Sequence, residues 1–315
     1  MPVSGRGAYS DRLDDDYWAY IERANAFFPS DALGWPLDEQ RRIYDRMCRA
    51  FHPGRPGGLI CEDTAISLRD RSIPIRRYRP ERALPGPMVL FFHGGGFVFG
   101  GLESHDDTVG DLCVETGIEM ISVDYRLAPE HPHPASFEDA LAAFDWLAAA
   151  TSQPIILLGE SAGGTLAAAV VHAVRGRARV PAGQLLIYPS LGGEPGRSHR
   201  EHAQAPLLTT AELAAYRDLR SGGQPPMADP SFEPLSDTSF ADLPATVVVT
   251  AECDPLSSEG EAYRDRIIAA GGDATWREEP RLTHSFLRAR PSAMRARQAF
   301  ERLVADLGEL AGRGG

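Results

Sequence analysis

The stretch IILLGESAGG, residues 155–164, decides more about the fold than any other part of the chain. Its first four residues are apolar and predict a short buried strand, and the small residues after Ser161 begin a helical pattern. Strand and helix are joined by the motif Gly-x-Ser-x-Gly, in which small residues permit a tight turn that presents the serine. A glycine-rich turn capped by a serine is the alternative interpretation, but the flanking strand and helix favour a nucleophile at Ser161.

Similar apolar runs recur on both sides of this stretch and alternate with helical patterns. Strands are predicted at residues 88–92, 118–123, 185–188 and 246–250, and two strands of alternating polarity at 64–68 and 73–78. Helices are predicted at residues 106–115, 137–149, 163–174, 259–270 and 293–310. Strands that alternate with helices form mostly parallel sheets with right-handed crossovers. The predicted fold class is therefore α/β, with a mostly parallel central sheet flanked by helices.

Two regions depart from this alternation and predict a helical cap. Residues 1–50 contain two helical patterns, the second of which extends from Leu37 to Phe51 with a period near 3.6. Residues 191–242 are rich in Gly, Pro and polar residues around one helical segment. We therefore expect residues 51–315 to form the α/β domain that carries Ser161, with 191–242 inserted as a cap that joins the N-terminal helices over the open end of the sheet.

The composition excludes several classes of function. The chain has 315 residues and a formal net charge of −12, and all 32 of its basic residues are arginine. The lack of lysine excludes phosphate loops and Schiff-base chemistry that depend on this residue. A pI near 5.2 disfavours nucleic acid as a partner, and no apolar stretch approaches the length of a membrane helix. The expected partner is a small molecule rather than a nucleic acid or a membrane.

The cysteines, the histidines and the N-terminus bear on cofactors and compartment. Four cysteines without a C-x-x-C pair argue against a disulfide framework or a zinc site. Two close histidine pairs, His131 with His133 and His199 with His202, have no convincing third ligand. The first 20 residues lack the basic start and apolar stretch of a signal peptide. We therefore expect a cytoplasmic protein without metal or other cofactor.

A nucleophile at Ser161 needs a base and an acid, which follow this kind of motif in the chain order serine, acid, histidine. Asp254 comes soon after the predicted strand 246–250, at the carboxyl end, where open α/β sheets collect catalytic groups. His284 is the only histidine that follows Asp254. Glu252 is the alternative acid, and a helix-capping role for Asp254 is compatible with catalysis. The predicted triad is Ser161, Asp254 and His284.

Three consecutive glycines, Gly94, Gly95 and Gly96, follow the predicted strand 88–92 and His93. Glycines leave backbone N–H groups unshielded, which an oxyanion hole requires. A phosphate-binding G-x-G-x-x-G motif is excluded because Phe99 stands where its last glycine would be. A flexible loop is the alternative, but an oxyanion hole agrees better with a nucleophile in the same chain.

Four motifs together resemble the hormone-sensitive-lipase-like family of α/β-hydrolases, which includes bacterial carboxylesterases and lipases. They are HGGG at 93–96, DYRLAPE at 124–130, GESAG at 159–163 and DPL at 254–256. The resemblance covers the chain from about residue 87 to the C-terminus. It implies an α/β-hydrolase core with a mainly helical cap, no cofactor, and hydrolysis of carboxylic esters. It also implies that Ala162, the residue after the nucleophile, adds its N–H to the oxyanion hole.

The chain departs from the family pattern at three positions near these motifs. Glu160 stands where the family often has aspartate, Ser258 where an acidic residue is common, and Ser285 where glycine usually follows the histidine. None of the three removes a member of the triad. The shape of the pocket beside His284 is the property that these departures affect.

The expected function is that of a serine carboxylesterase, which hydrolyses short- to medium-chain esters through an acyl-enzyme intermediate. A deacetylase or amidase that acts on a specific metabolite would carry the same triad. A receptor on a hydrolase scaffold is disfavoured, because the plant gibberellin receptor that resembles this family lacks the catalytic histidine, whereas His284 is present here. A homodimer is a possible oligomeric state, since related esterases often associate through a sheet edge.

Overall fold

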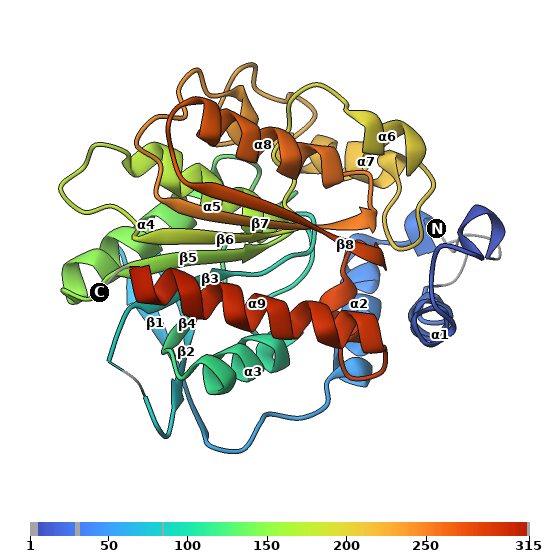
Figure 1. The fold of residues 1–315 in the computed structure, drawn as a ribbon, viewed down its shortest axis with the longest axis horizontal. Coiled ribbons are helices and arrows are strands. Elements are labelled where there is room, and N and C mark those ends of the chain that lie inside the picture. Colours follow the sequence, from blue (N-terminus) through green and yellow to red (C-terminus); the bar gives the residue numbers. More distant parts are fainter. Residues whose placement is uncertain (1–5, 29–31, 84, 314–315) are drawn as a thin grey trace.

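The computed structural model describes residues 6–28, 32–83 and 85–313, and a single sheet of eight strands forms the centre of this part of the chain (Figure 1). The strands are β1 (Leu59–Ser67), β2 (Ser72–Pro80), β3 (Met88–Phe92), β4 (Met120–Val123), β5 (Ile155–Glu160), β6 (Gly183–Ile187), β7 (Ala245–Cys253) and β8 (Ala274–Thr283). Their order across the sheet is β1-β2-β4-β3-β5-β6-β7-β8. β2 is antiparallel to both of its neighbours, and every pairing from β4 to β8 is parallel. The predicted α/β fold with a mostly parallel sheet is confirmed.

Helices cover both faces of the sheet, and each face has its own apolar core (Figure 1). On one face lie α3 (Asp106–Thr116) and α9 (Met294–Arg313). On the other lie α4 (Ala135–Ala150), α5 (Ala162–Val174) and α8 (Ser257–Ala269). Because both faces are covered, every residue of β3 and β5 is buried, which explains why these strands are continuous apolar runs in the sequence.

Four further helices gather at one end of the sheet (Figure 1). They are α1 (Asp15–Asn25), α2 (Leu37–Phe51), α6 (Arg197–Glu201) and α7 (Thr210–Ser221). The helix α2 is amphipathic and buries Ile43, Met47 and Phe51, which are spaced four residues apart and so lie on one face. Within the described residues, no helix has the length and apolar character that crossing a membrane requires.

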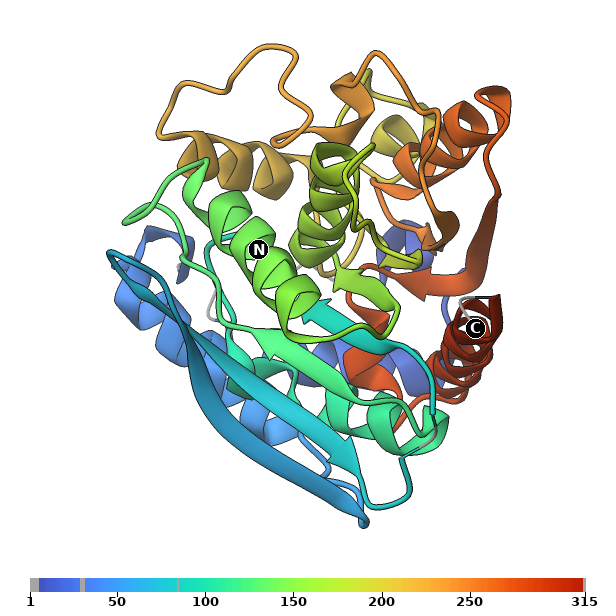
Figure 2. The same cartoon turned by 90° about the vertical axis from the view of Figure 1, so that its left-hand side faces the viewer.

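The strand β8 was not expected from the sequence. It contains charged residues and Pro280, and its burial alternates irregularly because it is the last strand at one edge of the sheet. Glu279 illustrates the difficulty: it is almost fully buried, yet ion pairs with Arg277 and Arg302 stabilise it there. The opposite edge is formed by the long, twisted pair β1 and β2, which Figure 2 shows side by side. A charged edge strand thus lacks the apolar run that identified the central strands.

Candidate active site

Ser161 occupies a strained turn between β5 and α5. Its backbone has φ 53° and ψ −116°, which residues other than glycine rarely adopt. Its N–H donates to the carbonyl of Ile187 on the neighbouring strand, at 2.9 Å. Both motif glycines are required sterically, since a Cβ on Gly159 would overlap the carbonyl of Gly163, and a Cβ on Gly163 would overlap that of Phe92. The turn therefore presents the Ser161 hydroxyl at the carboxyl end of β5.

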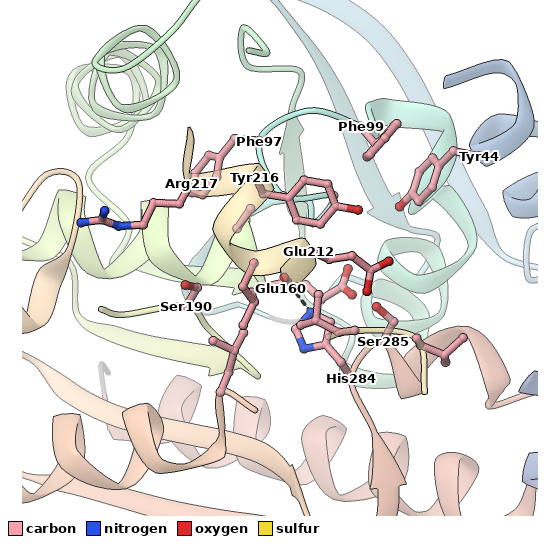
Figure 3. Close-up of a pocket in the computed structure, with 18 of the residues that line it drawn as sticks. Tyr44, Phe97, Phe99, Glu160, Ser190, Glu212, Tyr216, Arg217, His284 and Ser285 are labelled. Atoms are coloured by element: carbon pink, nitrogen blue, oxygen red, sulfur yellow. Dashed lines mark hydrogen bonds between the residues drawn. The ribbon is translucent and has the colours of Figure 1, made fainter. Parts of the chain in front are cut away.

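The register of the last two strands brings the other two predicted triad residues together. Cys253 on β7 pairs with Thr283 on β8, so the residues that follow, Asp254 and His284, leave the sheet side by side. His284 Nδ1 lies 2.8 Å from Asp254 Oδ2, and His284 Nε2 lies 2.8 Å from Ser161 Oγ. The dashed line at His284 in Figure 3 marks the second of these hydrogen bonds. The structure thus joins the three residues in one row.

Asp254 is fully buried, and its second oxygen accepts the N–H of Leu256 at 2.9 Å. The carboxylate therefore caps the turn that begins after it and at the same time holds His284. Its contact with His284 Nδ1 favours the tautomer in which Nδ1 carries the proton and Nε2 accepts one. Glu252, the alternative acid, is directed elsewhere: it accepts the N–H of Arg281 at 2.8 Å.

The glycines that follow β3 differ in their position relative to the cavity. Gly95 and Gly96 line it, as does Ala162, whereas Gly94 is buried with its α-carbon against the carboxylate of Glu160. Gly95 and Gly96 have φ 122° and 61°, and these positive values explain why glycine stands at both positions. Among the described residues, none accepts the N–H of Gly95, Gly96 or Ala162. These three N–H groups are available to a negative oxygen, and the N-terminus of α5 at Ala162 adds a favourable potential.

The glycine loop is held from behind by residues of the segment 124–130. Tyr125 stacks on the ring of His93 with centroids 4.2 Å apart and donates its hydroxyl to the His93 carbonyl at 2.7 Å. The N–H of Ala128 donates to the carbonyl of Phe97 at 2.8 Å. Burial, together with a neighbouring histidine, lowers the pKa of His93 to about 3, so its ring is a neutral packing group. These contacts explain why the DYRLAPE motif accompanies the HGGG motif.

Glu160 directly precedes Ser161 and is buried together with its partners. It forms an ion pair with His105, and the Tyr188 hydroxyl donates to it at 2.6 Å. Burial by itself raises the pKa of this carboxyl, but His105 and Tyr188 outweigh that effect and hold the pKa at about 2. The Tyr188 ring also lies against His284, with ring centroids 4.7 Å apart. The longer side chain of glutamate, compared with aspartate, therefore reaches His105 and Tyr188, and this network supports Ser161 and His284.

A cavity of about 540 Å³ opens beside His284 and is lined by residues of α1, α2 and α7 as well as by loops of the sheet. Tyr216 on α7 lies directly over Gly96, since a Cβ on that glycine would be 2.9 Å from the tyrosine ring. Figure 3 shows Tyr44, Phe99 and Tyr216 on the side of the cavity opposite His284. Tyr44 and Phe99 stack with ring centroids 5.4 Å apart. The entrance to the glycine loop is thus aromatic, and α7 supplies part of it.

The other two departures from the family pattern have local structural explanations. Ser285 has φ 63° and ψ 26°, the left-handed conformation that glycine adopts without strain, which costs a residue with a Cβ about 1 kcal/mol. Ser258 exchanges two hydrogen bonds with Ser198, at 2.9 Å and 3.0 Å, and thereby ties α6 to α8. The first departure lies in the cavity wall and the second outside it.

A family model described as an alpha/beta hydrolase fold matches residues 89–288, which is more than half of the chain. The chain belongs to this family. The predicted resemblance to its hormone-sensitive-lipase-like branch is confirmed.

Relatives of this α/β-hydrolase include Esterase LipI of Mycobacterium tuberculosis, which is 38% identical over 79% of this chain and 80% of its own length. Ethyl acetate hydrolase of Pseudomonas putida is 31% identical over 88% of this chain and 92% of its own. Among solved structures, the hyperthermophilic esterase from Pyrobaculum calidifontis has a TM-score of 0.86 and 30% identity, and the match covers 95% of this chain and 99% of that one. These proteins are named as ester hydrolases, in agreement with the enzyme class predicted from the sequence.

Several residues that shape the site were not predicted from the sequence. His105 and Tyr188 belong to no recognised motif, and Tyr216 on α7 is far along the sequence from Gly96, the glycine that it covers. As for metal binding, the described residues contain no group of three or more His, Cys, Asp or Glu arranged to hold an ion. His133, one of the histidines considered as a metal ligand, instead has its Nε2 3.0 Å from the carboxylate of Asp229.

Proposed function

We propose that this α/β-hydrolase is a serine carboxylesterase, which hydrolyses short- to medium-chain esters through an acyl-enzyme intermediate. The observation that carries the proposal is the hydrogen-bonded row Ser161–His284–Asp254, which lies beside a cavity of about 540 Å³ together with three N–H groups that have no acceptor among the described residues. A nucleophile, a base with a fixed tautomer and an anion site are the groups that acyl transfer requires.

The steps follow from the positions of these atoms. His284 Nε2 takes the proton of Ser161 as Oγ attacks the ester carbonyl, and Asp254 stabilises the imidazolium through Nδ1–H. The carbonyl oxygen becomes negative and accepts hydrogen bonds from the N–H groups of Gly95, Gly96 and Ala162. His284 then protonates the leaving alcohol, and a water activated by the same nitrogen releases the acid and restores Ser161.

In this proposal Gly94 has a different role from the other predicted members of the oxyanion hole. Its α-carbon packs against Glu160, and it does not line the cavity. We assign it to the support of the loop, because any Cβ at this position would be about 3.0 Å from the Glu160 carboxylate. The N–H groups of Gly95, Gly96 and Ala162 bind the oxyanion.

The size and lining of the cavity favour esters of limited length. Aromatic and aliphatic side chains from α1, α2 and α7 line it, and its volume is that of a site for a small organic molecule. This lining supports the assignment of residues 1–50 and 191–242 as the cap of a catalytic domain formed by the rest of 51–315. A cytoplasmic location and a homodimer complete the proposal; both rest on the sequence and on the habits of related esterases.

Hydrolysis of p-nitrophenyl esters from acetate to palmitate, measured for the wild type and for Ser161→Ala, tests the proposal. We expect a maximum at short to medium chains and a loss of at least about 10³-fold in kcat for the variant. Covalent labelling of Ser161 by a fluorophosphonate would support its role as nucleophile. Equal turnover in both proteins would exclude Ser161, and faster hydrolysis of amides than of esters with the same acyl group would identify an amidase instead.

A further inference from the structure

Arg288 brings a positive charge to the cavity at the end of the segment that carries the catalytic histidine. It lies in the short helix η5 (Phe286–Ala289), four residues after His284, and its side chain is half-buried in the cavity wall. One nitrogen, Nη2, donates to the carbonyl of Ser104 at 3.3 Å, and the guanidinium lies 5.4 Å from the ring centre of Tyr44. In the described part of the chain it forms no ion pair with a carboxylate within 4.0 Å, and Glu160 acts on it only through longer-range electrostatics.

The remaining donors of Arg288 are open to the cavity. Neither Nε nor Nη1 has a hydrogen-bond acceptor among the described residues, and neither is sealed off from solvent. A guanidinium carries five N–H groups in a planar fork and cannot lose its charge in a protein. Arg288 therefore presents a charged, geometrically fixed donor set to whatever occupies the cavity.

The other acidic and arginine side chains that line the cavity are already engaged. Each has a partner: Glu160 with His105, Asp107 with Arg290, Arg217 with Glu233, Glu259 with the N–H groups of Leu191 and Gly192, and Glu212 with Thr209. Arg220 is closed between the rings of Phe97 and Phe232 and donates to the carbonyls of Ser231 and Phe232. Arg288 is thus the cation of this lining, in the described chain, that has both an open donor set and no acid partner.

A carboxylate carried into the cavity would meet this charge beside the aromatic and aliphatic side chains that line the site. Charge-assisted hydrogen bonds between a guanidinium and a carboxylate are short and often paired, and they are stronger than neutral ones. The net charge of −12 gives anionic molecules no general attraction to the surface. A preference for them must therefore come from a local group, and Arg288 is placed to supply it.

We propose that Arg288 is a specificity-determining residue that binds a free carboxylate on the substrate, so that the preferred esters are monoesters with a second, anionic carboxylate. This inference rests on the proposed esterase function. The carboxylate lies on the acyl or the alcohol part of the ester, remote from the bond that is cleaved.

Another role for Arg288 is the support of Glu160: together with His105 and Tyr188 it lowers the pKa of this carboxyl, against the opposing effect of burial. The two roles predict different results. Loss of a support for Glu160 slows every ester to the same extent, because the disturbance lies next to Ser161. Loss of a carboxylate-binding group acts on the anionic ester alone, and mainly through KM, because a remote contact binds ground state and transition state alike.

The experiment compares matched anionic and neutral esters. The acyl series consists of monoethyl esters of glutarate, adipate and suberate against the corresponding diethyl esters. The alcohol series consists of 4-acetoxybutyrate against its methyl ester. kcat and KM are measured by titration of released acid for the wild type, Arg288→Gln and Arg288→Lys. Arg217→Gln serves as the control, because it removes one positive charge from the same lining but from a residue paired with Glu233 and directed away from His284 (Figure 3).

We expect the wild type to favour the anionic ester by about 10- to 100-fold in kcat/KM in one of the two series. Arg288→Gln should remove most of this preference through KM, Arg288→Lys should retain part of it, and Arg217→Gln should keep the wild-type ratio. Equal kcat/KM for anionic and neutral esters in the wild type, or a ratio that survives Arg288→Gln, would overturn the inference. Failure of the wild type to hydrolyse even p-nitrophenyl butyrate would instead overturn the proposed function, so the two failures are distinguishable.

Discussion

Gly96 connects the proposed oxyanion hole to the cap, and a single added methyl group tests both. A Cβ at this position would lie 2.9 Å from two ring carbons of Tyr216 and 3.2 Å from a third. Normal carbon–carbon contacts are about 3.5–4.0 Å. The backbone of Gly96 also has φ 61°, which costs residues with a Cβ about 1–2 kcal/mol. Gly96→Ala must therefore displace either the glycine loop or α7.

Displacement of the loop moves an N–H group away from the position of the oxyanion. Loss of one such donor typically lowers kcat by about 10²–10³-fold, which corresponds to roughly 3–4 kcal/mol of transition-state stabilisation. The strain alone affects stability rather than the reaction. We therefore expect Gly96→Ala to lower kcat by about 100-fold and to reduce the free energy of unfolding by about 1–2 kcal/mol.

Two further variants separate the contact from the strain. Tyr216→Ala removes the ring that the new methyl group would meet, so Gly96→Ala should cost less kcat in that background than in the wild type. Gly176 is the matched control for strain, because it has φ 77° and a Cβ there would meet nothing within 4 Å. Gly176→Ala should lower stability by an amount similar to the strain term and leave kcat as it is. The assay is p-nitrophenyl butyrate hydrolysis, with urea unfolding alongside.

Two outcomes would refute this reasoning. A Gly96→Ala enzyme with wild-type kcat would show that the added methyl group does not displace the N–H groups proposed to bind the oxyanion. An equal loss of kcat with and without the Tyr216 ring would show that the ring contact does not transmit the displacement. A loss that shrinks in the Tyr216→Ala background is the result that the geometry requires.

Two other predictions concern the supports of the site. Burial raises the pKa of Glu259 to about 8, although the N–H groups of Gly192 and Leu191 oppose this. The contribution of this carboxyl to stability is therefore complete below its unfolded pKa of about 4.5 and is lost as the pH rises toward 8. Glutamine cannot ionise, so the stability of Glu259→Gln relative to the wild type should increase by more than about 1 kcal/mol between pH 5 and pH 8, as measured by urea unfolding. A difference that is the same at both pH values would contradict this. The Tyr17 hydroxyl lies 2.8 Å from Thr283 Oγ1 and accepts the backbone N–H of Thr283 at 3.3 Å. Tyr17→Phe removes this hydroxyl, and we expect a loss of about 1–3 kcal/mol in the free energy of unfolding. We also expect a lower kcat, because Thr283 directly precedes His284. Unchanged kcat in a destabilised Tyr17→Phe enzyme would confine the role of this hydroxyl to folding.

The parts of the fold that the sequence predicted are those in which one local rule decides the structure. Central strands such as β3 and β5 are apolar throughout because both of their faces are covered, and α2 keeps its apolar face at helical spacing. The edge strand β8 follows no such rule. Its charges are satisfied by α9 and by its own neighbours, as when Arg277 contacts Asp306 and Glu279. These contacts form only after the chain has folded, so its sequence shows neither alternation nor an apolar run.

The candidate site divides in a similar way. Ser161 and the glycine loop have strong local requirements, since a backbone that must approach closely or adopt a positive φ selects small residues. Asp254 and His284 could be assigned by chain order. The network of Glu160, His105 and Tyr188 joins three segments that share no motif, so only the three-dimensional arrangement identifies it.

The segment from His284 to Arg288 combines the proposed catalytic base with two residues of the cavity wall, Ser285 and Arg288. Its first residue is fixed by Asp254, by the Tyr188 ring and, through Thr283, by Tyr17 on α1. Because His284 is held from three sides, its position depends little on the residues that follow it. Ser285 therefore tolerates a left-handed backbone without glycine, and Arg288 can face the cavity as an open cation. The residues beside His284 can thus set the substrate preference of the proposed esterase without altering the geometry of the Ser161–His284–Asp254 row.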